Sequence, residues 1–528
     1  MITEDQAAVV AFLASPGAHG GAPVETIDTH ASIVFLSGRR AWKLKRAVRY
    51  DYLDFSTADR RRAMCEAELR LNRRTAPSLY HRVVAVTREA DGGLALGGAG
   101  TPVDWVIEMS RFDQDDLLDR LAARQALGLG LMRPLAAAVA RLHAGAEPRR
   151  DHGGRDGMTW VVEGNDADFR AQPAGVFDGE ACRRIVTASR AAIERHHGLL
   201  DSRRESGLVR QCHGDLHLRN IVRLEGGPTL FDGVEFNDEI ACIDVMYDLA
   251  FLLMDLWRRA LPAHANAVLN GYLAETADVE ALALLPLFLS CRAAVRAKTG
   301  AAAAALQSDP SRQAEQWRAA REYLAMAETL LHPPPARLIA IGGLSGSGKS
   351  TLAFALAPTL GAVPGAVVVR SDEVRKRLCG VGPLDRLGSG GYTEAVSARV
   401  YRTAIDQAAR IVATGHSAIV DAVFARPGDR TAVERAGQDA GVPFAGLWLD
   451  ARPETLLGRV EHRHADASDA DTAVVRQQVA GDIGQLGWHH LNADGDLDAL
   501  VVEAREALRA ASPPQGTSTA APDGSGRG

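Results

Sequence analysis

The last third of the chain alternates short apolar runs with longer amphipathic segments. Four runs are apolar enough to be buried strands, at residues 338–341, 366–370, 418–420 and 444–449. The segments between them place apolar residues at helical spacing, as at 351–360. Strands that alternate with helices in this way predict an α/β domain built on a doubly wound parallel sheet.

The first third of the chain shows a different pattern. Residues 40–43 alternate as a strand does, and a helix is predicted from about residue 56 to just before Pro77. One carboxylate shares the apolar stripe of this helix, which consists of Met64, Ala67, Glu68 and Leu71. A buried carboxylate needs a cationic partner. Lys43 is the expected partner of Glu68, and Lys45, on the same face of the strand, is the alternative.

The chain divides near residue 334. An alanine-rich helical region runs from about residue 293 to residue 331, and His332 with the three prolines after it ends that region, because proline lacks the N–H group that a helix needs. We therefore predict two domains, at residues 1–333 (core about 20–330) and 334–511. The tail at 512–528 is rich in Ser, Pro, Gly and Thr and is predicted to be disordered.

Composition narrows the class of protein. The 528 residues include 60 Lys and Arg against 66 Asp and Glu, and a formal charge of −6 gives no reason to expect nucleic acid as a partner. The 6 cysteines are scattered without a C-x-x-C pair, as in reduced cytosolic proteins. The N-terminus lacks the order of a signal peptide, and the apolar stretches are too short to cross a bilayer. We expect a cytoplasmic protein without a membrane partner.

The strongest chemical signal is the sequence GLSGSGKS at residues 343–350, which fits the Walker A pattern G-x-x-x-x-G-K-[ST]. It follows a predicted strand and precedes a predicted helix, as the motif requires. Its backbone N–H groups can surround a phosphate of ATP, while Lys349 reaches the outer phosphates and Ser350 holds Mg²⁺. The predicted ATP-binding residues of this loop are Gly343, Ser345, Gly346, Ser347, Gly348, Lys349, Ser350 and Thr351.

Two carboxylates follow predicted strands of the same domain. Asp372 comes after residues 366–370, and Asp421 comes after residues 418–420. Ligands of doubly wound sheets bind at the carboxyl ends of strands, so both side chains are expected to face the Walker A loop. The alternative for Asp372 is a capping role at the start of the helix that follows it.

Residues 370–375, 420–424 and 459–471 resemble the small-molecule and polynucleotide P-loop kinases, a group that includes gluconate-kinase-like, polynucleotide-kinase-like and zeta-toxin-like proteins. The resemblance covers about residues 336–510. It implies that Asp372 accepts the proton of the acceptor hydroxyl, that Arg375 holds the acceptor and that Asp421 lies near Mg²⁺. It also implies that Arg459 and Arg463 close over the phosphates. A solvated helix face is the alternative for these two arginines.

The N-terminal domain contains the order H-x-D-x-x-x-x-N at residues 213–220, as kinase catalytic loops do. In such a loop Asp215 orients and deprotonates an acceptor hydroxyl, and Asn220 holds a metal ion. An apolar strand then leads to Asp232, in the place of the aspartate that binds Mg²⁺ in the D-F-G motif. Lys43, in an Ala-x-Lys strand, and Glu68 are predicted to complete the ATP site.

Residues 72–77, 213–220, 231–239 and 247–251 resemble the aminoglycoside phosphotransferase family, which has a protein-kinase-like fold. The resemblance covers about residues 20–330 and implies that Asp248 braces the catalytic segment. Residues 29–38 depart from the kinase pattern, since they contain no G-x-G-x-x-G loop. With its P-loop half, the chain is similar to bifunctional phosphotransferase/ATP-binding proteins of bacteria.

The leading hypothesis is an ATP:alcohol phosphotransferase in which both domains bind ATP and Mg²⁺ and phosphorylate hydroxyl groups of small molecules. One alternative is a single active P-loop kinase with the N-terminal half as a nucleotide-binding regulatory module. Another is a zeta-toxin-like or polynucleotide-kinase-like C-terminal half. Acceptor identity, protein partners and oligomeric state are beyond the sequence, because acceptor pockets are built from loops that vary on a shared fold.

Overall fold

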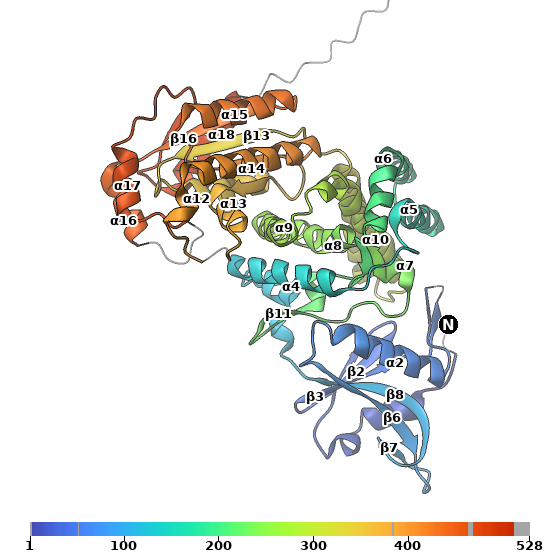
Figure 1. The fold of residues 1–528 in the computed structure, drawn as a ribbon. Coiled ribbons are helices and arrows are strands. Elements are labelled where there is room, and N and C mark those ends of the chain that lie inside the picture. The colour runs from blue at the N-terminus through green and yellow to red at the C-terminus, as the bar shows by residue number, and fades with distance from the viewer. Residues whose placement is uncertain (1–2, 51, 383–384, 463–467, 512–528) are drawn as a thin grey trace, which may run out of the picture. The chain divides into compact units, whose positions relative to one another are not determined.

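The computed structural model describes residues 3–50, 52–382, 385–462 and 468–511. The chain splits into two compact units, Met1–Pro333 and Pro334–Gly528 (Figure 1). The predicted tail at 512–528 lies outside the described residues. Within the described ranges, no helix is both long and apolar enough to cross a membrane.

The small lobe of the N-terminal unit is an antiparallel sheet of strand order β1-β2-β3-β8-β6-β7 with a helix on each face. On one face α1 (Ala7–Leu13) packs with Val9 and Leu13. On the other, α2 (Ala58–Asn72) packs against β6 and β8, and the Thr57 hydroxyl caps its first turn by accepting a hydrogen bond from the N–H of Arg60. The strands are β1 (Glu25–Asp28), β2 (Ser32–Ser37), β3 (Arg40–Lys45), β6 (Tyr80–Arg88), β7 (Leu94–Leu96) and β8 (Thr101–Ser110).

The large lobe of this unit is mainly helical and carries residues 213–220. They lie between strand β9 (Val209–Gln211) and the hairpin of β10 (Ile221–Leu224) and β11 (Gly227–Leu230), which ends just before Asp232. The long helices of the lobe are α4 (Met132–Gly145), α5 (Gly154–Ala171), α6 (Gly179–Glu205), α8 (Val245–Arg258), α9 (Pro262–Thr276), α10 (Leu285–Ala305) and α11 (Pro310–Leu330). An antiparallel sheet packed against α2 and followed by a helical lobe is the protein-kinase-like fold that the sequence predicted.

The helical region predicted at the end of the large lobe is helical in the structure and is divided into two helices. The helical region expected at residues 293–331 consists of two helices, α10 and α11, which pack against each other. The chain turns between them because Asp309 caps α11, accepting hydrogen bonds from the N–H groups of Ser311 and Arg312. Pro310 then occupies the first position of α11, where its missing N–H leaves no helical hydrogen bond unmade.

The C-terminal unit is a five-stranded sheet, all parallel, of order β14-β15-β13-β16-β17. The strands are β13 (Leu338–Gly343), β14 (Val367–Arg370), β15 (Ala418–Asp421), β16 (Phe444–Asp450) and β17 (His489–Asn492). Contacts divide the helices into two layers. One holds α12 (Lys349–Leu356) and α18 (Leu497–Ala510), and the other holds α13 (Ser371–Leu378), α14 (Glu394–Ala413) and α15 (Pro427–Asp439). This is the doubly wound sheet that the alternating pattern predicted.

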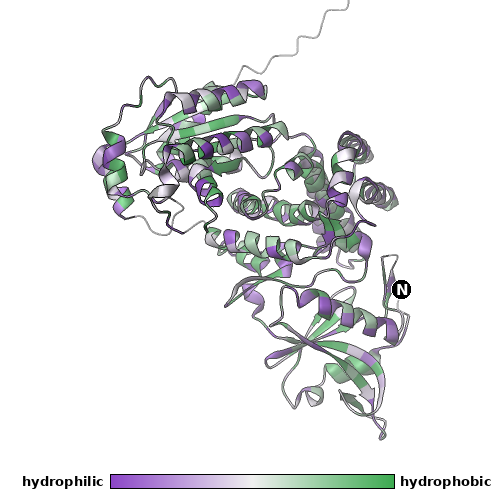
Figure 2. Cartoon of the chain, viewed as in Figure 1, coloured by the Kyte–Doolittle hydropathy of each residue, from purple (hydrophilic) through white to green (hydrophobic). Residues whose placement is uncertain are grey.

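Hydrophobic packing places the middle of this sheet deep in the unit. Ile339 and Ile341 of β13 are completely buried, and they join one core with Ile419 of β15 and Leu352 of α12. Figure 2 shows the strands of this sheet mostly in the green of apolar residues. Parallel strands covered on both faces read as continuous apolar runs, which is why these strands stood out in the sequence.

Candidate active sites

The loop between β13 and α12 is shaped by positions that only glycine tolerates. Gly346 has a φ of +88°, and a Cβ built there would lie 2.6 Å from the carbonyl oxygen of Leu456. Gly343 has a φ of +141°, and its Cβ would lie 2.7 Å from the Ser347 Oγ. At these two positions a side chain larger than hydrogen would displace the neighbouring atoms. Such a glycine loop at a helix start is the arrangement that surrounds phosphate with backbone N–H groups.

A hydroxyl and a carboxylate meet beside this loop. The Oγ of Ser350, at the start of α12, lies 2.5 Å from the Oδ2 of Asp421, at the end of β15. A hydroxyl with one carboxylate is a donor set that Mg²⁺ accepts together with phosphate oxygens, so these two residues fit the predicted metal site. The guanidinium of Arg370 lies 3.5 Å from the same carboxylate oxygen and donates a hydrogen bond to Ser350. The sequence analysis missed Arg370, although a cation that ends an apolar strand was a usable signal.

A cavity of about 460 Å³ gathers most of the residues predicted for this unit. Lys349, Asp372, Arg375, Asp421 and Arg459 all line it. Asp372 lies inside the first turn of α13, and the residue that precedes this helix as its cap is Arg370, so Asp372 is not the N-cap. Burial, and then the charge of Asp421, raise the pKa of Asp372, against the opposing pull of Arg370 and Lys349. A carboxylate with a raised pKa accepts a proton more readily, as a general base must.

Two predicted cations have defined places around the cavity. Arg375 is mostly buried, donates hydrogen bonds to the Gly391 carbonyl and the Ser397 hydroxyl, and lies 4.8 Å from the centre of the Tyr392 ring. Arg459 is exposed overall, but its guanidinium donates to the carbonyl oxygens of Ser347 and Ala493. Arg459 is thus fastened to the phosphate loop, and not to a purely solvated face. Arg463 lies outside the described residues.

One further contact of the loop was not predicted. The backbone N–H of Ser345 donates a 2.8 Å hydrogen bond to the Oε1 of Gln478, on α17 (Thr472–Val479). Ser345 and Gln478 are 133 positions apart. A contact between residues so distant in the sequence leaves no local pattern, so only the fold reveals it.

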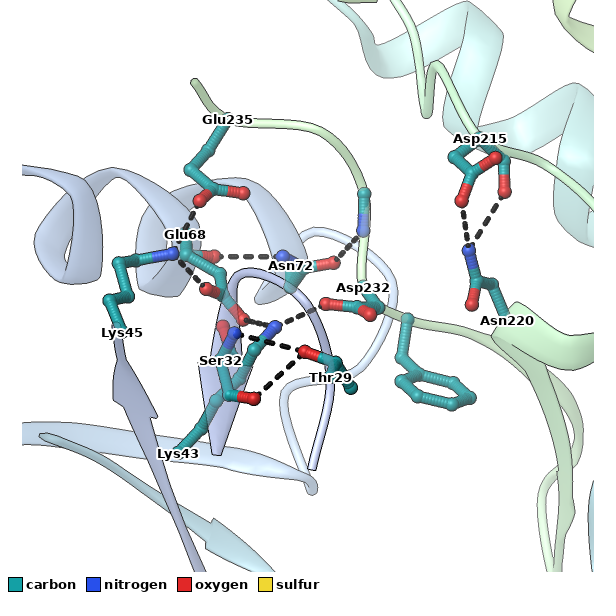
Figure 3. Close-up of polar contacts among 12 residues, drawn as sticks. Thr29, Ser32, Lys43, Lys45, Glu68, Asn72, Asp215, Asn220, Asp232 and Glu235 are labelled. Atoms are coloured by element: carbon teal, nitrogen blue, oxygen red, sulfur yellow. Dashed lines mark hydrogen bonds and ion pairs between the residues drawn. The ribbon is translucent and has the colours of Figure 1, made fainter. Parts of the chain in front are cut away.

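The N-terminal unit centres on a buried cluster of lysines and carboxylates (Figure 3). Glu68 of α2 is fully buried and accepts hydrogen bonds from Lys43 at 2.8 Å and from Lys45 at 2.7 Å. Each lysine holds a second carboxylate at 2.5 Å, which is Asp232 for Lys43 and Glu235 for Lys45. Both lysines proposed as partners of Glu68 are therefore its partners, and Glu235 is an addition that the sequence analysis missed.

Glu68 and Glu235, two of the three carboxylates of this cluster, differ in the direction of their pKa shifts. Burial opposes the ionisation of Glu68, but Lys43 and Lys45 outweigh it and lower its pKa to about 2. For Glu235 burial prevails over the attraction of Lys45, so its pKa is raised. Glu68, which receives both lysines, is the charge on which the cluster depends.

Exposure separates the two lysines. The side chain of Lys43 is 14% exposed and contacts the predicted metal ligand Asp232, whereas that of Lys45 is 2% exposed and contacts Glu235. Lys43 is thus the more accessible of the two lysines. Lys45 is held inside the lobe by two carboxylates and by the ring of Phe55, whose centre lies 4.8 Å from its Nζ.

The catalytic segment is fastened by backbone and side-chain contacts. The Nδ2 of Asn220 donates to the Oδ2 of Asp215 at 3.0 Å, and Figure 3 draws this pair beside Asp232. The buried carboxylate of Asp248 accepts the N–H groups of His213 and Gly214 at 3.0 and 2.9 Å, as its bracing role predicts. Burial favours the protonated form of Asp215, but the charges of His217, His213 and Arg296 prevail and hold its pKa below the usual range.

Asp232 is held in a constrained conformation. Its φ is +61°, in the left-handed region that few residues other than glycine adopt. Its N–H donates to the Tyr80 hydroxyl at 3.2 Å, and the next N–H, that of Gly233, donates to Asn72 at 2.8 Å. The side chain of Asp232 is thereby aimed at Lys43.

The turn between β1 and β2 contains no glycine, as the sequence indicated. Thr29 closes it, because its hydroxyl donates to the Ser32 carbonyl at 2.8 Å and accepts the N–H of Ser32 at 2.9 Å. Figure 3 draws Thr29 and Ser32, and Ser32 pairs with Lys45 of β3. Side-chain hydrogen bonds thus hold a turn that contains none of the glycines of a glycine-rich loop.

Comparisons with known proteins find likenesses to both units. A family model described as AAA domain matches residues 338–481. The uncharacterized protein Rv2004c of Mycobacterium tuberculosis (strain H37Rv) is 30% identical over 500 residues, which cover 92% of this chain and 96% of that protein.

Two solved structures align with parts of the chain. A choline/ethanolamine kinase family protein from Mesorhizobium loti is 14% identical over 61% of this chain and 94% of its own, with a TM-score of 0.37. A gluconokinase from Sinorhizobium meliloti 1021 is 19% identical over 33% of this chain and 95% of its own, with a TM-score of 0.24. The fold assignment itself rests on the strand order and register of each unit.

Proposed function

The chain belongs to the family of the mycobacterial protein Rv2004c, and we propose that it is an ATP-dependent phosphotransferase with one nucleotide site in each unit. Both sites would take ATP with Mg²⁺ and transfer the γ-phosphate to a hydroxyl group of a small molecule. The observation that carries the proposal is the single cavity in which Lys349, Ser350 and Asp421 face Asp372. Phosphate-binding groups, metal-binding groups and a base are all that phosphoryl transfer asks of a protein.

The proposed reaction needs no reactant besides ATP and the acceptor. The acceptor oxygen forms a bond to the γ-phosphorus as the bond from that phosphorus to the β,γ-bridging oxygen breaks, and ADP leaves. The hydroxyl proton passes to Asp372 in the C-terminal unit or to Asp215 in the N-terminal unit. Mg²⁺, held by Ser350 and Asp421 or by Asn220 and Asp232, would supply positive charge against the phosphate oxygens.

Support for the N-terminal site comes from its ion pairs. Lys43 is bound by Glu68 and Asp232 together, so the cation, the helix and the metal-ligand segment are already assembled. Burial disfavours the charged form of Lys43, but the negative charges of Asp232 and Glu68 outweigh it and raise the pKa of Lys43 well above its ordinary value. The cation therefore persists at any physiological pH. A permanent cation suits a ligand that carries several negative charges.

Titration calorimetry with a non-hydrolysable ATP analogue and Mg²⁺ tests the two sites. The full chain should bind two equivalents, Lys43→Ala and Lys349→Ala should each bind one, and the double variant should bind none. One equivalent in the unaltered chain, or the loss of both in a single variant, would contradict the two-site proposal. Acceptors can be sought by mass shift in a library of hydroxyl compounds, with Asp215→Asn and Asp372→Asn as the controls for each unit.

A second function has specific support. The turn without glycine and the lowered pKa of Asp215, which makes it a weak base, favour an N-terminal unit that binds nucleotide without transferring phosphate. In that case ATP consumption with every acceptor would be unchanged in Asp215→Asn and abolished in Lys349→Ala. Loss of one acceptor's phosphorylation in Asp215→Asn alone would exclude the regulatory function.

A further inference from the structure

A row of aromatic rings runs beside the proposed N-terminal site and has no part in the function proposed above. It begins at His30, whose ring centre lies 6.3 Å from that of Tyr50, and continues from Tyr50 to Tyr52 at 5.7 Å. Tyr52 lies 6.2 Å from Phe236, which lies 6.3 Å from Phe55. Each separation is within the range of interacting rings. We call these five residues the aromatic row.

The inner end of the row is fixed to the lysine–carboxylate cluster. Phe55 is 1% exposed, and its ring lies under the Nζ of Lys45. Phe236 directly follows Glu235, whose carboxylate holds the same lysine at 2.5 Å. Val48 and Leu53 pack with Phe55 and Phe236 in one apolar cluster. The rings at this end therefore cannot move without disturbing the proposed ATP site.

The middle of the row is exposed, and its two tyrosine rings are stacked. Tyr50, of β4 (Arg49–Tyr50), is 37% exposed and Tyr52 is 41% exposed, and the planes of their rings lie within 10° of parallel. Together with Phe236 they line an open cavity of about 820 Å³. Large exposed aromatic side chains that border a cavity are a common sign of a ligand site.

The row starts next to the groups that would carry out phosphate transfer. His30 follows Thr29 in the turn that leads into β2, and β2 pairs with β3, the strand that carries Lys43. Burial lowers the pKa of His30, while the negative charge of Asp215 acts in the opposite direction. At the other end, Phe236 lies four positions after Asp232 in the same segment. A molecule on the tyrosines would therefore lie at the edge of the proposed active site.

We propose that Tyr50, Tyr52 and Phe236 form the acceptor-binding surface of the N-terminal unit, and that its acceptor carries a planar aromatic ring beside the hydroxyl group. The proposal deepens the phosphotransferase function and rests on it. A flat ring would extend the existing stack of Tyr50 on Tyr52. A cationic ligand would gain little from Asp54, because this carboxylate, which lines the cavity, is already paired with Arg49 at 3.6 Å and with Arg60.

Two matched probes separate ring stacking from hydroxyl binding. The first is 4-hydroxybenzyl alcohol, and the second is 4-(hydroxymethyl)cyclohexanol, which has the same hydroxyl groups on a ring that is not planar. Their affinities for the full chain can be measured by saturation-transfer NMR without ATP. We expect the planar probe to bind roughly five- to tenfold more tightly, as the loss of one stacking contact predicts. Equal affinities of the two probes would overturn the proposal.

Variants locate the binding on the row. Tyr50→Leu and Tyr52→Leu should each weaken the planar probe roughly three- to tenfold and leave the cyclohexane probe unchanged. Tyr52→Phe keeps the ring and should bind as the unaltered chain does. Trp160→Leu is the matched control, since Trp160 is 48% exposed on α5, outside the row. An unchanged affinity in both tyrosine-to-leucine variants, or an equal loss in Trp160→Leu, would refute the assignment.

Probe binding and phosphate transfer, measured separately, distinguish the acceptor surface from the phosphotransferase function. Asp215→Asn should keep the binding of the planar probe and lose phosphate transfer to it. Transfer that depends on Asp215 but is indifferent to Tyr50 and Tyr52 would leave the phosphotransferase function standing and overturn the acceptor surface. Probe binding that depends on the tyrosines, with no transfer in the unaltered chain, would keep the surface as a binding site and contradict the catalytic role.

Discussion

Replacing Glu68 by glutamine tests whether the N-terminal unit depends on its buried charge cluster. Despite burial, Lys43 and Lys45 lower the pKa of Glu68 from 4.5 to about 2. A fully buried carboxylate with such a pKa contributes about 3 kcal/mol to stability in its ionised form. Removing one member of a buried ion pair costs roughly 3–5 kcal/mol in other proteins. Because each lysine keeps a second carboxylate in Glu68→Gln, we expect the low end, about 3 kcal/mol.

The sign of the pH dependence follows from the same lowered pKa. The contribution of Glu68 is complete above its ordinary pKa of 4.5 and is lost as the pH falls towards about 2. Glu235 behaves in the opposite sense. Its pKa is raised because burial outweighs the attraction of Lys45, so its ionised form adds no net stability at neutral pH. Glu235→Gln should therefore lower the free energy of unfolding by less than about 1 kcal/mol.

Hydrogen exchange with mass spectrometry at increasing urea concentration measures these effects on the full chain, from peptides of β3 and α2. Glu66→Gln is the matched control, since Glu66 lies on the same helix, is 44% exposed and pairs with the exposed Arg62. It should change the free energy by no more than about 0.5 kcal/mol. A loss below about 1 kcal/mol in Glu68→Gln, or a loss equal to that of Glu235→Gln, would refute the electrostatic argument.

Three further predictions concern the proposed nucleotide sites. Lys43→Met should weaken the binding of an ATP analogue to the N-terminal unit roughly 10- to 100-fold, whereas Lys45→Met should stay within about threefold, because Lys43 is the more exposed of the two lysines. Calorimetry in the Lys349→Ala background measures both affinities, and the reverse order would contradict the assignment. Asp372→Asn should slow transfer by the C-terminal unit by about 10²- to 10⁴-fold. In the unaltered chain the rate should rise with pH through a pKa above the ordinary value for aspartate, because only the ionised base accepts a proton. A rate that rises at the ordinary aspartate pKa would show that burial does not shift the pKa of Asp372. Arg459→Ala should raise the KM for ATP about fivefold, since its guanidinium holds the phosphate loop at Ser347, and an unchanged KM in steady-state kinetics would remove Arg459 from the nucleotide site.

Much of the C-terminal fold could be predicted from the sequence. The four predicted strands correspond to β13, β14, β15 and β16, with ends that differ by no more than two residues. The fifth strand, β17, was missed because it is an edge strand in which only Leu491 is buried, so its sequence HHLN shows no apolar run. The predicted helix at 351–360 begins earlier and is shorter, as α12, because Pro358 cannot continue an α-helix and residues 357–359 form a 3₁₀ helix instead.

The N-terminal cluster could be predicted only in part. Strand alternation placed Lys43 and Lys45 on one face, and the helical stripe placed Glu68 among apolar residues, but neither pattern decides which lysine meets which carboxylate. That choice depends on Asp232 and Glu235, which lie 189 and 190 positions from their lysines. The same limit applied to Gln478, whose partner Ser345 lies 133 positions away in the loop between β13 and α12.

This difference between the units has a physical origin. The C-terminal unit would bind phosphate with the N–H groups of one continuous loop. The glycines that this loop needs lie close together in the sequence, so they can be recognised as a motif. In the N-terminal unit the cation for phosphate would be a side chain, and burying Lys43 requires carboxylates from α2 and from the segment after β11. A charge taken out of water must be matched by charges brought from elsewhere in the fold. The first arrangement should therefore fail when one glycine is enlarged, as at Gly346, whereas the second should fail when the packing of α2 against the sheet is disturbed.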